Sequence, residues 1–184
     1  MEPQVIATPD AFRAELIDDG ARSLFDYWQG LRGPRAMPAR ADIDPLEIPR
    51  NILPWLYILA VSDDGNHRFR LAGTGLDTVF NAEITGKRVD EVLEGRDLEN
   101  ARRSYDFVIS RARPWYSSVL YRADERWEIR YSRLTLPLGP DGEKPDFLIG
   151  GLFLDQDEGM FERFAELFAR RGVDPSARRE VVLA

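Results

Sequence analysis

The chain contains no cysteine and only one histidine, His67, among its 184 residues. The lack of cysteine excludes a disulfide framework, a thiolate nucleophile and a thiolate metal site. With no second histidine, Ser117, Ser118 and Ser132 lack the partner that activates a catalytic serine. His67 itself follows a predicted turn and is expected to face solvent, where it is poorly placed as an axial haem ligand. The sequence therefore predicts no catalytic residue.

Long apolar runs and an excess of positive charge are also missing. No run approaches the ~18 apolar residues that span a bilayer, and no signal peptide starts the chain, so we expect a cytoplasmic protein. The formal net charge of -7 argues against a partner such as nucleic acid or a membrane surface. Two pairs of acidic residues fall in predicted turns, Asp63 with Asp64 and Asp155 with Asp157. We expect their carboxylates to be solvated and not to form a metal site.

What is present is the composition of an ordinary globular domain, with 43% apolar residues. Thr8–Pro9 predicts a helix start, with a hydroxyl cap before the proline. A second helix is predicted by an apolar stripe at helical spacing, which ends at Gly33–Pro34. The stripe consists of Leu24, Phe25, Trp28 and Leu31. It either covers the core of its own domain or pairs with a second copy of the chain. A proline-rich connector follows.

The middle of the chain predicts a β-hairpin. Residues 53–61 form an apolar run of strand length, and residues 62–66 supply the turn. From His67 the apolar residues Phe69 and Leu71 alternate with arginines, which predicts a half-buried strand. Gly73 and Gly75 then allow a sharp turn into a short helix, for which Thr74 is a candidate cap.

The second half predicts one long helix over residues 97–113, ended by Pro114, and three strands over 115–121, 127–138 and 147–154. In the middle strand the apolar residues change from odd to even positions, which predicts a bulge near Arg133–Leu134.

Two features remain near the C-terminal end. The pair Gly150–Gly151 indicates that another part of the chain closely approaches the backbone of the last predicted strand. A final helix is predicted by Met160, Phe161, Phe164, Leu167 and Phe168, with a frayed tail over residues 173–184.

The residues that carry a family resemblance lie in three places. They are Arg68–Thr74 with Ile84–Gly86, Leu134–Leu138 before Gly139–Gly142, and upstream Trp28, Pro38–Pro45 and Leu53–Pro54. Together they resemble a PAS domain of a family of short, stand-alone bacterial proteins, over roughly residues 24–155. Asn81 stands where the family pattern more often has glycine, and asparagine tolerates the left-handed conformation that such a turn needs.

The resemblance implies an α+β fold: a five-stranded antiparallel sheet with helices on one face around a small cavity, plus flanking helices. Residues 1–52 would form a helical and proline-rich lead-in, 53–155 the PAS-like core, and 156–184 a C-terminal helix and tail. A light-sensing flavin domain of this fold uses a cysteine for its adduct, so the lack of cysteine excludes that class of domain. A flavin held without a covalent bond stays an alternative that no residue of the sequence supports. We expect no cofactor and no metal.

A sensory cavity is the candidate site, and a few polar groups in an apolar cleft orient small ligands. The candidate wall residues are Leu56, Ile58, Phe69, Leu71, Phe80, Tyr105, Ile109, Val119, Ile129, Tyr131, Arg133 and Ile149. Arg133 could present a charge to an acidic ligand. The alternative is that these side chains fill the core and that Arg133 is exposed.

Three functional hypotheses follow. The first is a non-catalytic sensory module of bacterial signalling that binds a small molecule and forms a homodimer. The second is an adaptor with a filled interior that binds a signalling protein. The third is an enzyme of a cone-shaped α+β fold, which would need a buried Asp–His or Tyr–Asp pair.

Overall fold

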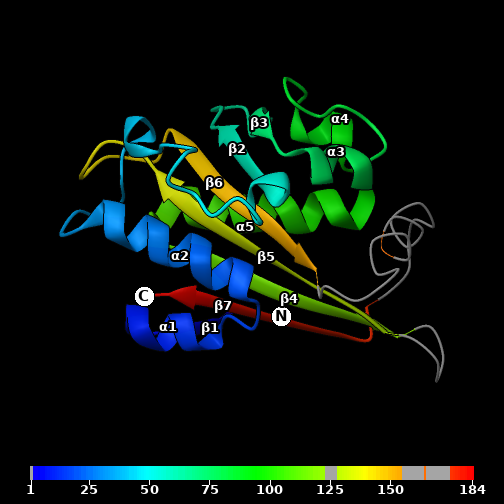
Figure 1. Cartoon of the computed structure of the whole chain (residues 1–184), viewed down its shortest axis with the longest axis horizontal. Coiled ribbons are helices and arrows are strands. Elements are labelled where there is room, and N and C mark those ends of the chain that lie inside the picture. Colours follow the sequence, from blue (N-terminus) through cyan, green and yellow to red (C-terminus); the bar gives the residue numbers. More distant parts are fainter. Residues whose placement is uncertain (1, 123–127, 155–163, 165–174) are drawn as a thin grey trace.

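The computed structural model describes residues 2–122, 128–154, 164 and 175–184. Their helices and strands form one layered α+β unit around a single sheet (Figure 1). In chain order these elements are β1 (Gln4–Ile6), α1 (Pro9–Glu15), α2 (Asp19–Arg32), β2 (Leu56–Ala60), β3 (Arg68–Ala72), α3 (Thr74–Val79), α4 (Val89–Val92), α5 (Gly95–Arg111), β4 (Trp115–Arg122), β5 (Glu128–Leu138), β6 (Phe147–Leu154) and β7 (Ala177–Leu183). Short 3-10 turns occupy Arg40–Asp42 and Leu53–Trp55.

The sheet is larger than the sequence predicted. Its seven described strands run in the order β1-β7-β4-β5-β6-β2-β3, and the five expected strands form the antiparallel part from β4 to β3. The prediction of a frayed tail was wrong, because β7 pairs antiparallel with β4 and parallel with β1. The apolar residues Val181, Val182 and Leu183 explain this pairing, since all three are buried in the sheet.

The helices α3, α4 and α5 cover one face of the sheet, as expected, and the N-terminal helices α1 and α2 cover the other. In Figure 1, α1 and α2 lie on the near side of the strands and α5 on the far side. The apolar stripe of α2 packs on the sheet, with Leu24, Phe25 and Trp28 at most 1% exposed. Trp28 also donates a buried hydrogen bond of 2.8 Å from Nε1 to the carbonyl oxygen of Pro137 in β5. Of the two interpretations of this stripe, the structure therefore shows the one in which it covers the core of its own domain.

The bulge predicted in β5 was wrong. β5 pairs in continuous register with β4 up to Thr135 and with β6 up to Leu138. Ile129 and Tyr131 belong to the apolar cluster on the α5 side, whereas Leu134, Leu136 and Leu138 belong to the cluster under α1 and α2. The apolar positions change parity because the strand buries a different face along its length.

A bulge does occur elsewhere, in the β2–β3 hairpin. Ile58 pairs with Leu71 and Leu59 pairs with Phe69, so Arg70 is an additional residue in β3. A bulge reverses the face to which the following side chains point. Phe69 is therefore buried on the α5 side, and Leu71 lies on the opposite face with Ile58.

Several local predictions are confirmed. Thr8 caps α1 through a hydrogen bond of 3.3 Å from the Ala11 amide to its Oγ1. Asn81 adopts the left-handed conformation, with φ of 48°. Thr74, however, is not a cap, because Gly73 occupies the N-cap position of α3. A Cβ at Gly73 would lie 2.3 Å from the carbonyl oxygens of Leu53 and Pro54, so the backbone passes too close there for any side chain.

The expected final helix lies outside the described residues except for Phe164. That residue is helical and fully buried, with its ring centroid 5.0 Å from that of Tyr131. Residues 124–125, between the predicted strands 115–121 and 127–138, also lie outside the described residues. None of the helices in the described ranges is long and apolar enough to cross a bilayer.

Candidate functional site

A cavity lies between the sheet and the helices on the α5 side. The volume open to the centre of a water molecule is about 50 Å³. A single water needs roughly 10–15 Å³ of such volume, so the space holds a few waters or a small molecule. The lining residues are Tyr57, Phe69, Leu76, Phe80, Ile84, Leu93, Asp97, Asn100, Tyr105, Ser117, Val119, Tyr131, Arg133, Leu152 and Arg178.

The sheet register brings the polar members of this set together from strands far apart in sequence. Arg133 of β5 pairs with Ser117 of β4 on one side and with Leu152 of β6 on the other. In the next row, Val119 of β4 pairs with Tyr131 on one side and with Arg178 of β7 on the other. Side chains of paired residues on adjacent strands point to the same face of a sheet, and so do side chains two residues apart on one strand. Arg133 and Arg178 therefore both point to the face that borders the cavity.

The guanidinium of Arg133 is partly buried and forms no hydrogen bond or ion pair with any described residue. Burial lowers its pKa, and the surrounding tyrosines Tyr105, Tyr57 and Tyr131 together with Asp97 raise it by more. The pKa therefore stays above its ordinary value, and the group is cationic at every physiological pH.

Three phenols surround this cation. Tyr57 Oη lies 3.0 Å from Thr135 Oγ1, and the rings of Tyr57 and Tyr105 meet edge to face with centroids 6.4 Å apart. Burial raises the pKa of Tyr105 and that of Tyr131 above their ordinary value. Tyr105 and Tyr131 are therefore neutral near pH 7, and their phenols can donate or accept hydrogen bonds.

Gly150 of β6 makes room for the Tyr57 ring. A Cβ at Gly150 would lie 2.3 Å from both Cζ and Oη of Tyr57 and 2.7 Å from the carbonyl oxygen of Leu134. The close approach predicted for Gly150–Gly151 is thus confirmed, and it fixes one wall of the cavity.

The remaining charges of the cavity come from α5 and β7. Burial raises the pKa of Asp97, and the cations Arg133 and Arg178 lower it in part. Arg178 Nη1 lies 3.7 Å from Oε1 of Glu180, which also pairs with Arg103 of α5. Glu180 is 5% exposed, and its Oε2 has no hydrogen-bond partner among the described residues. Arg178 is therefore already partly compensated, whereas Arg133 is not.

The structure places the candidate wall residues in three groups. Phe69, Phe80, Tyr105, Val119, Tyr131 and Arg133 line the cavity, while Ile109 and Ile129 are buried in the same apolar cluster away from its lining. Leu56, Ile58 and Ile149 are buried on the opposite face, and Leu71 is 37% exposed. Placing these last four on the cavity wall was wrong. β2 is buried on both faces, so its sequence gave no alternation, and the Arg70 bulge turned Leu71 away.

Sequence reasoning missed several polar residues of the cavity. Tyr57 has the opposite parity from the residues chosen in β2, and Asp97 and Asn100 come from the first turns of α5. Arg178 lies in the tail that was expected to fray. Ser117 shares odd parity with the predicted wall residue Val119 in the same strand, a signal that could have identified it.

His67 is buried rather than facing solvent, so that prediction was wrong. It is 3% exposed, its Nδ1 accepts a hydrogen bond of 3.1 Å from the Ser62 amide, and its ring meets that of Tyr105 edge to face with centroids 6.0 Å apart. Burial lowers its pKa, against the opposing influence of Asp106 and Asp64. Its Nε2 has no partner among the described residues. His67 does not line the cavity.

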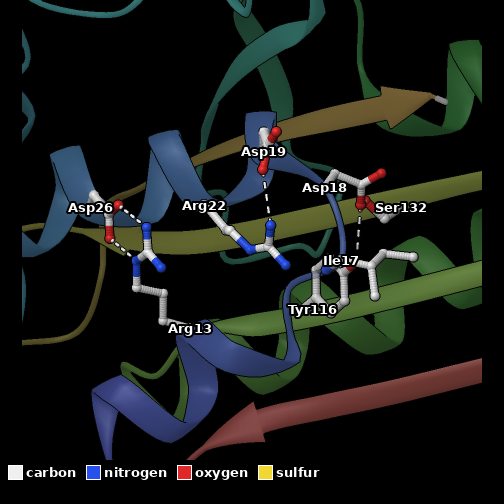
Figure 2. A network of polar contacts seen from close by, with 8 residues as sticks. All are labelled: Arg13, Ile17, Asp18, Asp19, Arg22, Asp26, Tyr116 and Ser132. Atoms are coloured by element: carbon white, nitrogen blue, oxygen red, sulfur yellow. Dashed lines mark hydrogen bonds and ion pairs between the residues drawn. The ribbon is translucent and has the colours of Figure 1, made fainter. Parts of the chain in front are cut away.

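A Tyr–Asp pair does exist, on the other face of the sheet. Tyr116 of β4 donates a hydrogen bond of 3.0 Å to Asp18 Oδ2, Ser132 of β5 donates to the same oxygen, and the Ile17 amide donates to the Tyr116 hydroxyl (Figure 2). Tyr116 belongs to the cluster under α1 and α2. The network therefore ties the α1–α2 junction to the sheet, away from the cavity. Across the described ranges no group of three or more carboxylates and histidines could hold a metal ion.

Comparison with known proteins agrees with the fold. A sequence model described as a PAS domain matches residues 18–153. The chain belongs to the PAS domain family. The matched segment begins at the end of the α1–α2 junction and extends into β6, so it includes every wall of the cavity except Arg178.

Two solved structures illustrate the similarity of this PAS domain to known ones. The Rhodobacter sphaeroides LOV protein has 15% identity and a TM-score of 0.42, with 64% of this chain and 90% of that chain covered. The PAS domain of Bordetella pertussis BvgS has 16% identity and a TM-score of 0.41, with 64% and 88% covered. A comparison with curated protein sequences found no match.

Proposed function

We propose that this PAS domain is a non-catalytic sensory module that binds a small molecule in the cavity between the sheet and α5. The observation that carries the proposal is the composition of the cavity wall. Apolar side chains such as Phe69 and Leu152 surround the polar groups of Arg133, Asp97 and Ser117. A few convergent polar groups in an apolar cleft are typical of small-molecule sites.

The alternatives differ in what the interior contains. The adaptor hypothesis supposed a filled core, and the described residues leave a cavity instead. The enzyme hypothesis needed an acid-base pair facing a substrate. The pair formed by Tyr116 and Asp18 lies on the face opposite the cavity, and His67 is outside its lining. Membership of the PAS family further favours a sensory role.

Mass spectrometry of the purified protein under native and then denaturing conditions tests the proposal. We expect a mass excess under native conditions that disappears on denaturation, because the ligand is held without a covalent bond. A protein that carries no excess mass, and that no small molecule stabilises against heat, would refute ligand binding and favour the adaptor.

The same native spectrum tests the expected homodimer, which we propose as the signalling form in a bacterial cytoplasm. The apolar stripe of α2 cannot supply the dimer interface, because Leu24, Phe25 and Trp28 are already buried against the sheet. A dimer must therefore use another surface. A strictly monomeric mass at micromolar protein concentration would contradict this part of the proposal.

A further inference from the structure

The guanidinium of Arg133 is the feature of the cavity that the fold alone does not explain. An arginine offers a planar fork of N–H donors, and partly or fully buried charges in proteins are normally paired. Arg133 has neither a hydrogen bond nor an ion pair within the described residues, although Ser117, Tyr131 and Asp97 line the same space. A cation kept unpaired in a concave site is suited to an anionic partner from outside the chain.

The charges of the lining limit the charge of that partner. Two arginines, Arg133 and Arg178, and one aspartate, Asp97, line the cavity, which leaves one positive charge in excess. Glu180 pairs with both Arg178 and Arg103, so counting Glu180 and Arg103 together leaves this excess unchanged. A monoanion matches the excess, whereas a dianion would meet the Asp97 carboxylate without a second free cation.

The shape of the site limits its size and geometry. About 50 Å³ of space holds roughly three to five water-sized groups. The planar fork of an arginine matches the two oxygens of a carboxylate better than a point cation does. The neighbouring apolar side chains, among them Phe69, Val119 and Leu152, can cover a short hydrocarbon substituent.

We propose that the cavity binds a small monocarboxylate, with its two oxygens on the Arg133 guanidinium and its substituent against the apolar wall. This inference rests on the proposed function, because it names the ligand class of the same cavity. Asp97 then acts as a selectivity group that opposes a second negative charge on the ligand. The phenols of Tyr57 and Tyr105 supply hydrogen-bonding groups around it.

The test is thermal unfolding of the full chain with acetate or propionate, compared with acetamide and propionamide as uncharged molecules of the same shape. Ionic strength is held constant with chloride. At ten times the dissociation constant we expect a carboxylate to raise the melting temperature by roughly 3–6 °C. The matching amides should leave it unchanged, because they lack the charge that pairs with Arg133.

Variants assign the effect to the cavity. Arg133→Gln should abolish the shift, and Arg133→Lys, which keeps the charge but loses the fork, should weaken binding roughly tenfold or more. Asp97→Asn should strengthen acetate binding, because it removes the opposing carboxylate. Arg50→Gln is the control, since Arg50 is exposed and forms no hydrogen bond or ion pair with the described residues, and it should behave as the parent. Circular dichroism of each variant verifies the fold, and Arg133→Lys serves as the test if Arg133→Gln does not fold.

Three results would overturn the inference. They are no shift with either carboxylate at about 50 mM at constant ionic strength, equal shifts with the amides, and a shift that survives Arg133→Gln. These outcomes are separable from failure of the proposed function. A neutral or cationic molecule found by native mass spectrometry, with no carboxylate effect, would refute the monocarboxylate and leave a small-molecule sensor. No bound molecule and no stabilisation by any probe would refute both.

Discussion

Gly150→Ala should destabilise the protein strongly even though it adds a single methyl group. The new Cβ would lie 2.3 Å from Cζ and Oη of Tyr57 and 2.7 Å from the carbonyl oxygen of Leu134. The Leu134 oxygen is backbone of β5, paired with β6 at this point, so it cannot move without disturbing the sheet. The Tyr57 ring is held by Thr135 and by its contacts with Phe69 and Tyr105.

The expected loss follows from these contacts. Overpacking a well-packed core costs about 1–3 kcal/mol. Displacing Tyr57 also loses its hydrogen bond to Thr135, worth about 0.5–1.5 kcal/mol. The reduced entropy of the unfolded chain gives back about 0.4–1 kcal/mol. We therefore expect the free energy of unfolding to fall by about 2–3 kcal/mol, measured by urea unfolding followed by tryptophan fluorescence.

Gly30→Ala is the matched control. Gly30 is an exposed residue within α2, and a Cβ there would have no heavy atom within 4 Å. The same chemical change should therefore stabilise the protein by about 0.5–1 kcal/mol. Combining Gly150→Ala with Tyr57→Leu should cost less than the two single changes added together, because the smaller side chain vacates the space. A Gly150→Ala protein within 0.5 kcal/mol of the parent would refute the reasoning.

Three further changes test separate contacts. Trp28→Phe removes the donor to the Pro137 carbonyl, and urea unfolding should show a loss of about 1–3 kcal/mol; no loss would mean that this bond is replaced. Asn81→Gly should preserve or raise stability, whereas Asn81→Val should lose about 1–2 kcal/mol because its φ is positive; equal stabilities would contradict this. Burial lowers the pKa of His67 below its ordinary 6.5, so the unfolded chain takes up the proton first. The urea midpoint should therefore fall as the pH drops below about 6.5, and less so in His67→Gln; an NMR titration that gives His67 a pKa above 6.5 would reverse the expected sign.

The order of elements could be predicted because it depends on local signals. The Thr8 cap, the hairpin turn at 62–66 and Pro114 at the end of α5 all act within a few residues of where they stand. Each breaks or starts a helix or strand through its own backbone chemistry. Such signals predicted the order of helices and strands, and the family resemblance supplied the fold class.

The faces of the strands could not be predicted in the same way. The parity of β5 changes because α2, about a hundred residues earlier, covers one half of its far face. A period-2 pattern does not show which element covers each face of a strand. The shift of the apolar residues from odd to even positions was therefore interpreted as a bulge. In β3 a bulge is present although the sequence does not indicate one. Apolar residues and arginines alternate without interruption across Arg70, the additional residue. Two of the four misplaced wall residues, Ile58 and Leu71, form the pair next to that bulge.

The position of β7 in the sheet has a consequence for how the protein is made. Gln4 pairs through β1 with Val181, so the first and last described strands can meet only after the residues between them have been made. Loop-closure entropy rises slowly with length, and this contact closes one of the longest loops in the molecule. Arg178 lies on the same strand, so a chain still emerging from a ribosome has an unfinished cavity. A molecule that binds there would stabilise the state in which β7 is paired over states in which this strand has not yet joined the sheet.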